Sequence, residues 1–295
     1  MTTGKALLHD RRAVIGLAII GTFALVAILA PLLAPADPNA QPDILGTRFL
    51  APMSSGPDGT TYWLGTDRFG RDILSRLIYG ARISLTVGVL SVVVSVIVGC
   101  AVGISAAVAG GWVERVLMAA TDTVLAMPRI VVLLTLVALW EPSVLLVLLV
   151  LGLTGWMGIA RLARAEVKSI LARPYLDAAK ALGISGPRLL WRHILPNTMT
   201  PVIVAAALAV GNAITLESGL SFLGIGIPPP APSWGSMIAT GRDALVHAPW
   251  IATFPGIAIV LAVVATNLIG DSMRDALDPT TRERGETQST IAPSR

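Results

Sequence analysis

Residues that could do chemistry are few in this sequence, and their spacing does not bring them together. The three histidines, His9, His193 and His247, are far apart and show no spacing typical of a metal site. The single cysteine, Cys100, lies in an apolar run and can form no internal disulfide. No G-x-x-x-x-G-K-[ST] pattern, which would cradle a nucleotide phosphate, is present. We therefore predict that this chain is not an enzyme and binds no metal or cofactor of its own.

Three further residues could act at membrane depth, where ionisable groups are candidate functional groups. Asp122 lies in an apolar run two helical turns before Arg129, and Glu217 ends another such run. Gly155 is the middle one of three glycines at three-residue spacing, which could form a flat face for helix packing or line a pore. We predict Asp122, Gly155 and Glu217 as candidate pore or gate residues. For Asp122 and Arg129 we favour the alternative of a structural role facing neighbouring helices.

The stretch 175–197, YLDAAKALGISGPRLLWRHILPN, combines helix signals with a break. Pro174 can start a short helix that Gly183 is placed to end. Ser185 offers an N-cap side chain for a second helix, with Pro187 in its first turn. These signals predict a helix–break–helix unit, for which the pattern alone also allows an amphipathic interfacial linker. Its apolar side comprises Leu176, Ala179, Leu182, Leu189, Leu190 and Ile194, and its basic side Lys180, Arg188 and Arg192.

This stretch resembles the EAA loop of ABC importer permeases, the segment that docks onto a cytoplasmic ATPase. The family pattern has an acidic residue, two alanines, a later glycine and a closing Leu-Pro. The residues in those places are Asp177, Ala178, Ala179, Gly183, Leu195 and Pro196. Asp177 departs from the usual glutamate, which keeps the charge and shortens the reach by one methylene. The resemblance implies that these six residues dock an ATPase, with Leu195 and Pro196 forming a corner.

Composition predicts an all-α polytopic membrane protein, since 54% of the 295 residues are hydrophobic and 14% are charged. The net charge of +4 is explained by basic cytoplasmic loops and requires no nucleic acid. A membrane span needs about 20 apolar residues. We predict six spans, at 13–34, 83–109, 112–140, 143–160, 196–216 and 251–270. A cleavable signal peptide is disfavoured because the first run exceeds the roughly 7–15 residues of a signal core.

Charge and composition divide the chain into four parts. These are 1–34, a cytoplasmic arm and first span; 35–82, an external loop with an interfacial helix at 72–79; 83–279, a permease core with coupling loop 175–197 and external loop 218–250; and 280–295, a disordered cytoplasmic tail. Basic residues cluster in 161–192, so we place this segment and both termini in the cytoplasm. Position 58 and Trp234 should then lie outside. The external arginines, Arg68, Arg71, Arg76 and Arg82, strain that topology.

The loop 218–250 is rich in proline and glycine and cannot satisfy its own backbone in lipid. We expect it to lie outside or to be buried against protein, as a re-entrant or scoop-like loop. Its motifs LSFLG, PPxPSWG and APW, with FPG and GDxxRDALDP beyond it, are similar to those of C-type peptide permeases. The stretch 61–85 also resembles a segment near the start of those permeases. On this basis the chain is identified as a member of the C-type dipeptide, oligopeptide and nickel permease family.

The resemblance implies an inner-membrane subunit that forms half of a pore for short peptides, with nickel or another small solute as the alternative cargo. It implies four kinds of partner: a second, homologous permease in a heterodimer, two ATPase subunits that carry ATP and Mg, an external binding protein, and the lipid bilayer. An ion-coupled secondary transporter is the alternative from another class. It would be expected to show an inverted repeat or ionisable residues at mid-membrane, and neither pattern is found.

Overall fold

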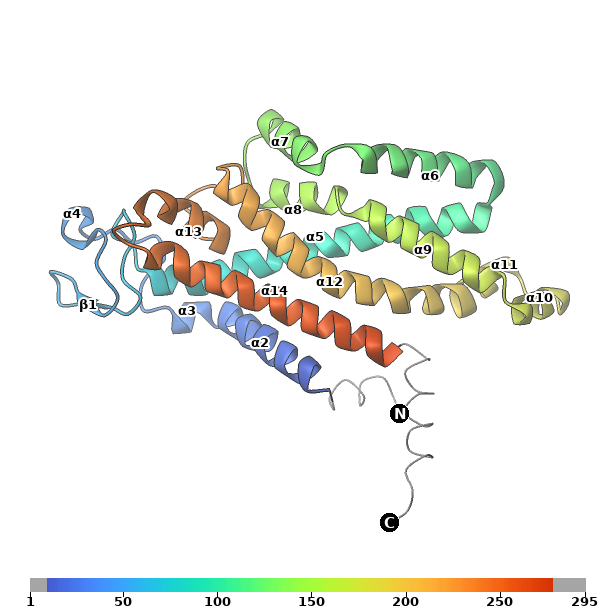
Figure 1. Ribbon diagram of the computed structural model, residues 1–295, viewed down its shortest axis with the longest axis horizontal. Helices are drawn as coiled ribbons and strands as arrows, with labels where there is room; N and C mark the ends of the chain where they lie inside the picture. Colours follow the sequence, from blue (N-terminus) through green and yellow to red (C-terminus); the bar gives the residue numbers. More distant parts are fainter. Residues whose placement is uncertain (1–9, 278–295) are drawn as a thin grey trace, which may run out of the picture.

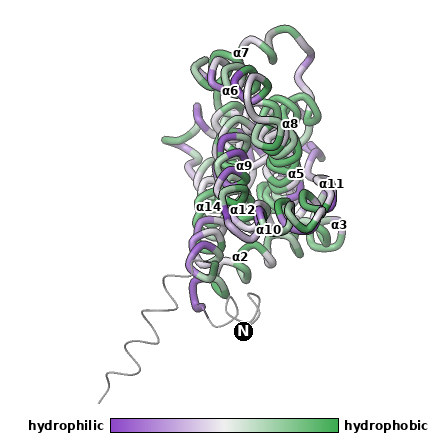
Figure 2. The backbone as a smooth tube through the Cα atoms, turned by 90° about the vertical axis from the view of Figure 1, so that its right-hand side faces the viewer, coloured by the Kyte–Doolittle hydropathy of each residue, from purple (hydrophilic) through white to green (hydrophobic). Residues whose placement is uncertain are grey.

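The computed structural model describes residues 10–277, and its regular structure is almost entirely helical (Figure 1). Seen from the α10–α11 end, the bundle is largely hydrophobic, with hydrophilic residues on α9 and α11 (Figure 2). The long helices that build the bundle are α2 (Arg11–Ile28), α5 (Ile73–Ala109), α9 (Trp156–Leu171), α12 (Leu195–Phe222) and α14 (Trp250–Leu277). The predicted all-α polytopic fold is confirmed.

Within the described residues, five segments are long and apolar enough to cross a membrane. They are α2, α5, α14, the pair α8 (Val144–Leu153) and α9, and the run 186–222 that ends in α12. A bent pair, α6 (Gly111–Ala126) and α7 (Arg129–Leu139), makes a sixth if it is counted as one span. The described ends of the chain lie at the same end of the bundle as α10 and α11 (Figure 1).

The predicted span 112–140 is bent rather than straight, because α6 and α7 meet at an angle of 86°. Pro128 causes the break. Its ring disfavours helical backbone at the preceding residue, and Met127 is accordingly extended, with φ −73° and ψ 133°. A proline also shapes the first span, where Leu29 separates α2 from α3 (Ala30–Leu33), which has Pro31 in its first turn.

The separate interfacial helix predicted at 72–79 is also wrong, because α5 is one helix of 37 residues that begins at Ile73. Asp72 caps its N-terminus by accepting the Ser75 backbone N–H at 2.7 Å. Gly80 does not end the helix, because it packs against Trp234: a Cβ there would lie 3.1 Å from Trp234 Cδ1. Glycine within a helix costs about 1 kcal/mol, which such packing offsets.

The segment before α5 contains α4 (Ile44–Thr47) and a short antiparallel hairpin, β1 (Ser54–Ser55) and β2 (Thr61–Tyr62). Two arginines, Arg71 of this segment and Arg76 of α5, are buried beside the carboxylate of Asp67. Arg71 Nε donates to Asp67 Oδ2 at 2.7 Å, and Arg76 Nη1 donates to the Pro38 carbonyl at 2.9 Å. Arg71 and Arg76 therefore serve the internal structure, which removes part of the strain that they place on the predicted topology.

The loop predicted at 218–250 is shorter than expected, because α12 continues to Phe222 and α14 begins at Trp250. Between them, α13 (Trp234–Gly241) and the 3-10 turn η2 (Arg242–Ala244) fold back against the bundle. This arrangement agrees with the predicted re-entrant or scoop-like loop. The sixth span is likewise longer than predicted and runs to Leu277. The predicted tail 280–295 lies outside the described residues.

Close contact between α5 and α9 depends on two glycines. A Cβ at Gly99 would lie 2.7 Å from both Ile159 Cβ and the Trp156 carbonyl oxygen. A Cβ at Gly103 would overlap the Ala160 carbonyl. The two glycines therefore let α9 pack directly against α5.

Trp234 is the largest side chain at the outer end of the core and is only 1% exposed. It belongs to an apolar cluster that draws on four long helices, with Ala27 of α2, Ala81 of α5, Ile214 of α12 and Ala258 and Ala262 of α14. The indole N–H donates to the Leu77 carbonyl at 3.1 Å. Trp234 therefore joins α13 to the bundle, and a labelling reagent that probes topology would not reach it.

We expect Trp234→Ala to lower the free energy of unfolding by about 3–5 kcal/mol, because it removes a buried aromatic ring and leaves a cavity. Thermal unfolding in detergent micelles measures this change as a lower midpoint. Trp112→Ala is the control, since the Trp112 side chain is 70% exposed. Equal midpoints for the two variants would contradict the role of Trp234.

Candidate functional site

The predicted helix–break–helix unit is present as α10 (Pro174–Ala181), a break at Gly183, and α11 (Gly186–Leu189). We call residues 174–194 the coupling unit. Gly183 has φ +79°, a left-handed conformation that glycine adopts readily. The Ile184 N–H then reaches back to the Ala179 carbonyl at 3.2 Å, as in a Schellman helix end. Gly183 thus ends the first helix, as predicted.

One side of the coupling unit is fixed to the bundle. Leu176, Ala179, Leu189 and Ile194 are buried in a single apolar cluster. The same cluster contains Ala107 of α5 and Val167 and Ile170 of α9. The unit is therefore packed on the ends of two long helices, so a displacement of the unit displaces these helix ends with it. Ala179, predicted to dock, lies on this inner side.

The other side is exposed, and it carries Asp177, Ala178 and Gly183 of the predicted docking residues. Leu182 is 82% exposed and Trp191 is 69% exposed. Leu182 was predicted on the packed side, which is wrong: α10 ends at Ala181, so helical periodicity no longer places its side chain. The N-cap hydrogen bond predicted for Ser185 is also absent in the described structure.

Leu195 and Pro196 do not form the predicted corner, because helix continues from Gly186 to Phe222. A proline lacks the N–H of a helical hydrogen bond and crowds the carbonyl four residues earlier. The preceding turn, η1 (Leu190–Ile194), is a π-helix, and the Leu195 N–H bonds the Leu190 carbonyl five residues earlier. This wider turn accommodates Pro196 without a break. The coupling unit therefore leads directly into α12.

Acidic residues of α6 pair with basic residues of α9, a contact that the sequence analysis missed. Glu114 Oε1 accepts from Arg164 Nε at 2.6 Å and from Lys168 Nζ at 2.7 Å. Asp122 Oδ1 lies 3.3 Å from Arg161 Nε. The sequence held one signal for these ion pairs: the basic residues 161, 164 and 168 are spaced so that they share one helix face. Asp122 therefore faces a neighbouring helix, as the structural alternative predicted.

Gly155 lines a cavity of about 320 Å³ within the bundle, between α5, α9 and α12. Arg129 also lines it, held by hydrogen bonds of 3.1 Å to Thr154 Oγ1 and to the Leu151 carbonyl. Ser95 lies against Gly155, where a Cβ would overlap its hydroxyl. Asp122 borders a different cavity, beside Glu114. The structure therefore does not bring Asp122 and Gly155 together, and their pore roles remain predictions.

Glu217 is fully buried and belongs to a hydrogen-bond cluster. Its carboxylate accepts from Ser221 Oγ at 2.8 Å, Ser233 Oγ at 2.9 Å and Ser84 Oγ at 3.4 Å. Ser84 Oγ also accepts the Trp234 backbone N–H at 3.1 Å. The cluster joins α12 to α5 and to the start of α13. This placement favours a structural role for Glu217, and its predicted role as a gate is untested.

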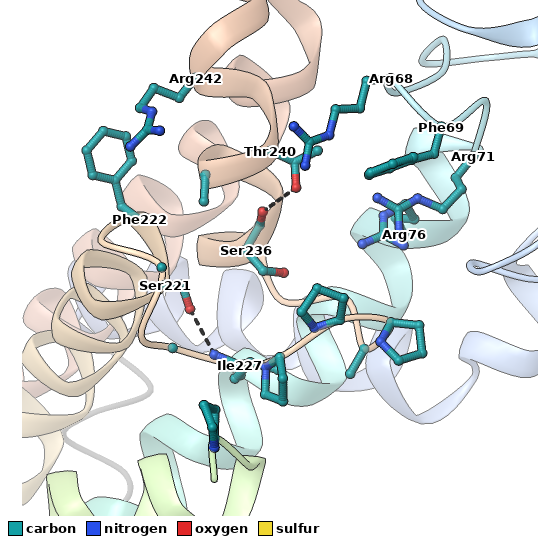
Figure 3. Close-up of a pocket in the computed structure, with 18 of the residues that line it drawn as sticks. Arg68, Phe69, Arg71, Arg76, Ser221, Phe222, Ile227, Ser236, Thr240 and Arg242 are labelled. Carbon is teal, nitrogen blue, oxygen red and sulfur yellow. Dashed lines mark hydrogen bonds between the residues drawn. The ribbon is translucent and has the colours of Figure 1, made fainter. Parts of the chain in front are cut away.

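A third cavity, of about 680 Å³, opens at the end of the bundle that carries α13, opposite the coupling unit (Figures 1 and 3). We call it the outer cavity. Its lining comes from the loop before α5, from the end of α12 and from α13 and η2. Within residues 10–277, no group of three or more His, Cys, Asp or Glu side chains is placed to hold a metal ion.

Comparison with known families gives two matches. Residues 99–283, more than half of the chain, match the binding-protein-dependent transport system inner membrane component. This chain belongs to that family. Residues 3–52 match the N-terminal TM domain of oligopeptide transport permease C. The family is one of multi-pass inner-membrane permeases, and the chain is a permease subunit of that kind.

Individual relatives agree with this assignment. A dipeptide transport system permease protein of Alkalihalophilus pseudofirmus is 39% identical over 93% of this chain and 88% of its own length. A Brucella abortus protein, named provisionally as a peptide transport system permease, is 40% identical over 96% and 93%. A chain of the MetNI methionine ABC transporter has a TM-score of 0.59, with 16% identity, over 70% of this chain and 98% of that one. This last likeness shows the fold.

We expect Gly183→Ala to loosen the end of α10, because a Cβ is strained by about 1–2 kcal/mol in left-handed backbone. Amide hydrogen exchange at residues 176–182 should become about 5- to 30-fold faster, while that of α14 stays unchanged. Gly186→Ala is the matched control, since Gly186 lies in open space and lacks a positive φ. If both variants exchange at the wild-type rate, Gly183 is not needed for the break.

Proposed function

We propose that this chain is one permease subunit of an ATP-driven importer for short peptides, and that its coupling unit docks a cytoplasmic ATPase. One observation carries the proposal. The coupling unit exposes Asp177, Ala178, Leu182 and Gly183 while its other side is buried against α5 and α9. A surface that is open to a partner yet fixed to the bundle suits transmission of force. The relatives with peptide and dipeptide names support peptides as the cargo.

The mechanism follows from how the unit is attached. When ATP closes the ATPases, each pulls a coupling unit inward as a rigid body. The buried cluster passes this displacement to α5 and α9, and the continuous helix 186–222 passes it to α12. The bundle then switches between two packed arrangements that open to opposite sides of the membrane. Hydrolysis of ATP takes place on the partner subunits, which hold the nucleotide and Mg.

Closure of the two ATPase subunits requires two coupling units, one for each ATPase. The described part of this chain contains one. The second comes from a homologous permease in a heterodimer, and an external binding protein delivers the cargo. Exposed apolar side chains on α5, such as Val93 and Ile97, suit lipid or such a neighbour. The end with the coupling unit and both termini faces the cytoplasm, as the basic residues of 161–192 indicate. Nickel or another small solute is the alternative cargo on this scaffold.

Proteoliposomes test the proposal. The chain, a homologous permease and the ATPases are purified together, and the loaded binding protein is supplied outside. We expect one copy of each permease per complex, and uptake of a labelled tripeptide only when ATP is enclosed. Uptake that follows an imposed ion gradient without ATP would instead indicate a secondary transporter. Nickel uptake without peptide uptake would support the alternative cargo.

Leu182→Ala tests the docking surface itself. We expect ATPase affinity to fall about tenfold or more, because burial of a leucine side chain on docking contributes about 1.5–3 kcal/mol. The thermal midpoint of the permease should not change, since Leu182 is 82% exposed in the chain alone. Leu25→Ala, an exposed leucine on α2, is the matched control. Normal co-purification of the ATPase with Leu182→Ala would place docking elsewhere.

A further inference from the structure

The outer cavity combines a size and a lining that suit a small ligand. Its volume of about 680 Å³ lies within the roughly 300–1,000 Å³ typical of ligand pockets. Part of the wall is apolar, with Phe222, Ile227 and three consecutive prolines at 228–230. Figure 3 shows arginines from two different segments at this wall, Arg68 and Arg71 on one side and Arg242 on another.

The charge of the lining is strongly positive. Arg68, Arg71, Arg76 and Arg242 line the cavity, and Asp243 is the one acidic residue among the lining residues. A second carboxylate, Asp67, lies behind the wall, 2.7 Å from Arg71 and 3.9 Å from Arg76. Two buried guanidinium groups therefore share one carboxylate. Asp72, a further buried acid nearby, is occupied as the cap of α5.

The two rim arginines, Arg68 and Arg242, are free to turn toward a ligand. Within the described residues Arg68 makes no ion pair, and its guanidinium lies over the Phe69 ring at 4.6 Å. Arg242 is bonded to the adjacent Asp243 at 3.1 Å, but its side chain is 54% exposed. An exposed pair of this kind contributes little stability and gives way readily. Both arginines are therefore available for a new partner.

The three hydroxyl groups that line the cavity already donate hydrogen bonds to other groups of the protein. Ser221 donates to Glu217, Ser236 donates to the Ser233 carbonyl at 3.0 Å, and Thr240 donates to the Ser236 carbonyl at 2.8 Å. The side-chain donors that remain for a ligand are the Gln41 amide and the guanidinium N–H groups, and only the guanidinium groups are charged. A guanidinium pairs best with a planar, doubly accepting anion such as a carboxylate. The site thus selects for negative charge.

We propose that the outer cavity binds the C-terminal carboxylate of a short peptide on its way into the transporter, with Arg68 and Arg242 as its ligands. This inference rests on the proposed function. The cavity is larger than a lone inorganic anion needs, and its apolar wall can hold peptide side chains. The excess positive charge also draws an anionic group toward the mouth before contact. An acidic side chain of the binding protein offers the same chemistry, so the test must separate the two sources.

The test uses the proteoliposomes with trialanine as cargo, since its C-terminus is its one carboxylate. The variants are Arg68→Gln, Arg242→Gln and the double variant. We expect the double variant to take up trialanine about tenfold more slowly or worse, because each charged hydrogen bond is lost. A variant with lysine at both positions should take up trialanine faster than the double glutamine variant but more slowly than wild type, because lysine keeps the charge and loses the bidentate pairing. Arg48→Gln is the matched control, an exposed external arginine outside the cavity.

Docking of the empty binding protein to the complex is measured in parallel. Unchanged docking together with slow uptake supports a site for the peptide. Docking weakened as strongly as uptake would assign the carboxylate to the binding protein and overturn the inference. Uptake by the double variant within twofold of wild type would also overturn it. If wild-type complexes take up no peptide at all, the proposed function fails first, which is a different result from a loss confined to the variants.

Discussion

A buried carboxylate in a membrane must find its hydrogen bonds within the protein, and the outer half of this structure depends on that constraint. Glu217 meets it with hydroxyls from α5, α12 and the segment that leads into α13. Ser84 of this cluster also holds the backbone of Trp234, whose ring packs among four spans. The position of α13, and with it one wall of the outer cavity, therefore depends on the hydrogen bonds of Glu217 together with the packing of Trp234.

The inner half depends instead on close approach of helices. Gly99 and Gly103 let α9 lie directly against α5, and the coupling unit rests on the ends of both. Ion pairs of Glu114 and Asp122 join α6 to the same face of α9. The coupling unit is thus attached to several helices at once. A force applied to it reaches the bundle through packed side chains rather than through a flexible loop.

Local signals in the sequence predicted the helical elements well. The left-handed break at Gly183 and the apolar spans both depend on residues close in the chain. The specific partners of residues that pack against distant parts of the chain were missed. Asp122 pairs with Arg161, which lies on another helix. Gly80 remains inside α5, where Trp234 packs against it. The corner expected at Pro196 is absent for another reason. A π-helical turn lets the helix continue through the proline, and residue types do not reveal such a turn.

The bonds of Glu217 also bear on how the chain enters the membrane. Synthesis runs from the N-terminus, so Ser84 is present long before Glu217 emerges, whereas Ser233 follows 16 residues later. Until that serine arrives, the carboxylate lacks one of its three hydroxyl donors. The hydrogen bonds of Glu217 on α12 are therefore complete only after the segment leading into α13 has been made. The order in which these residues are synthesised therefore sets the order in which the hydrogen bonds of the outer half can form.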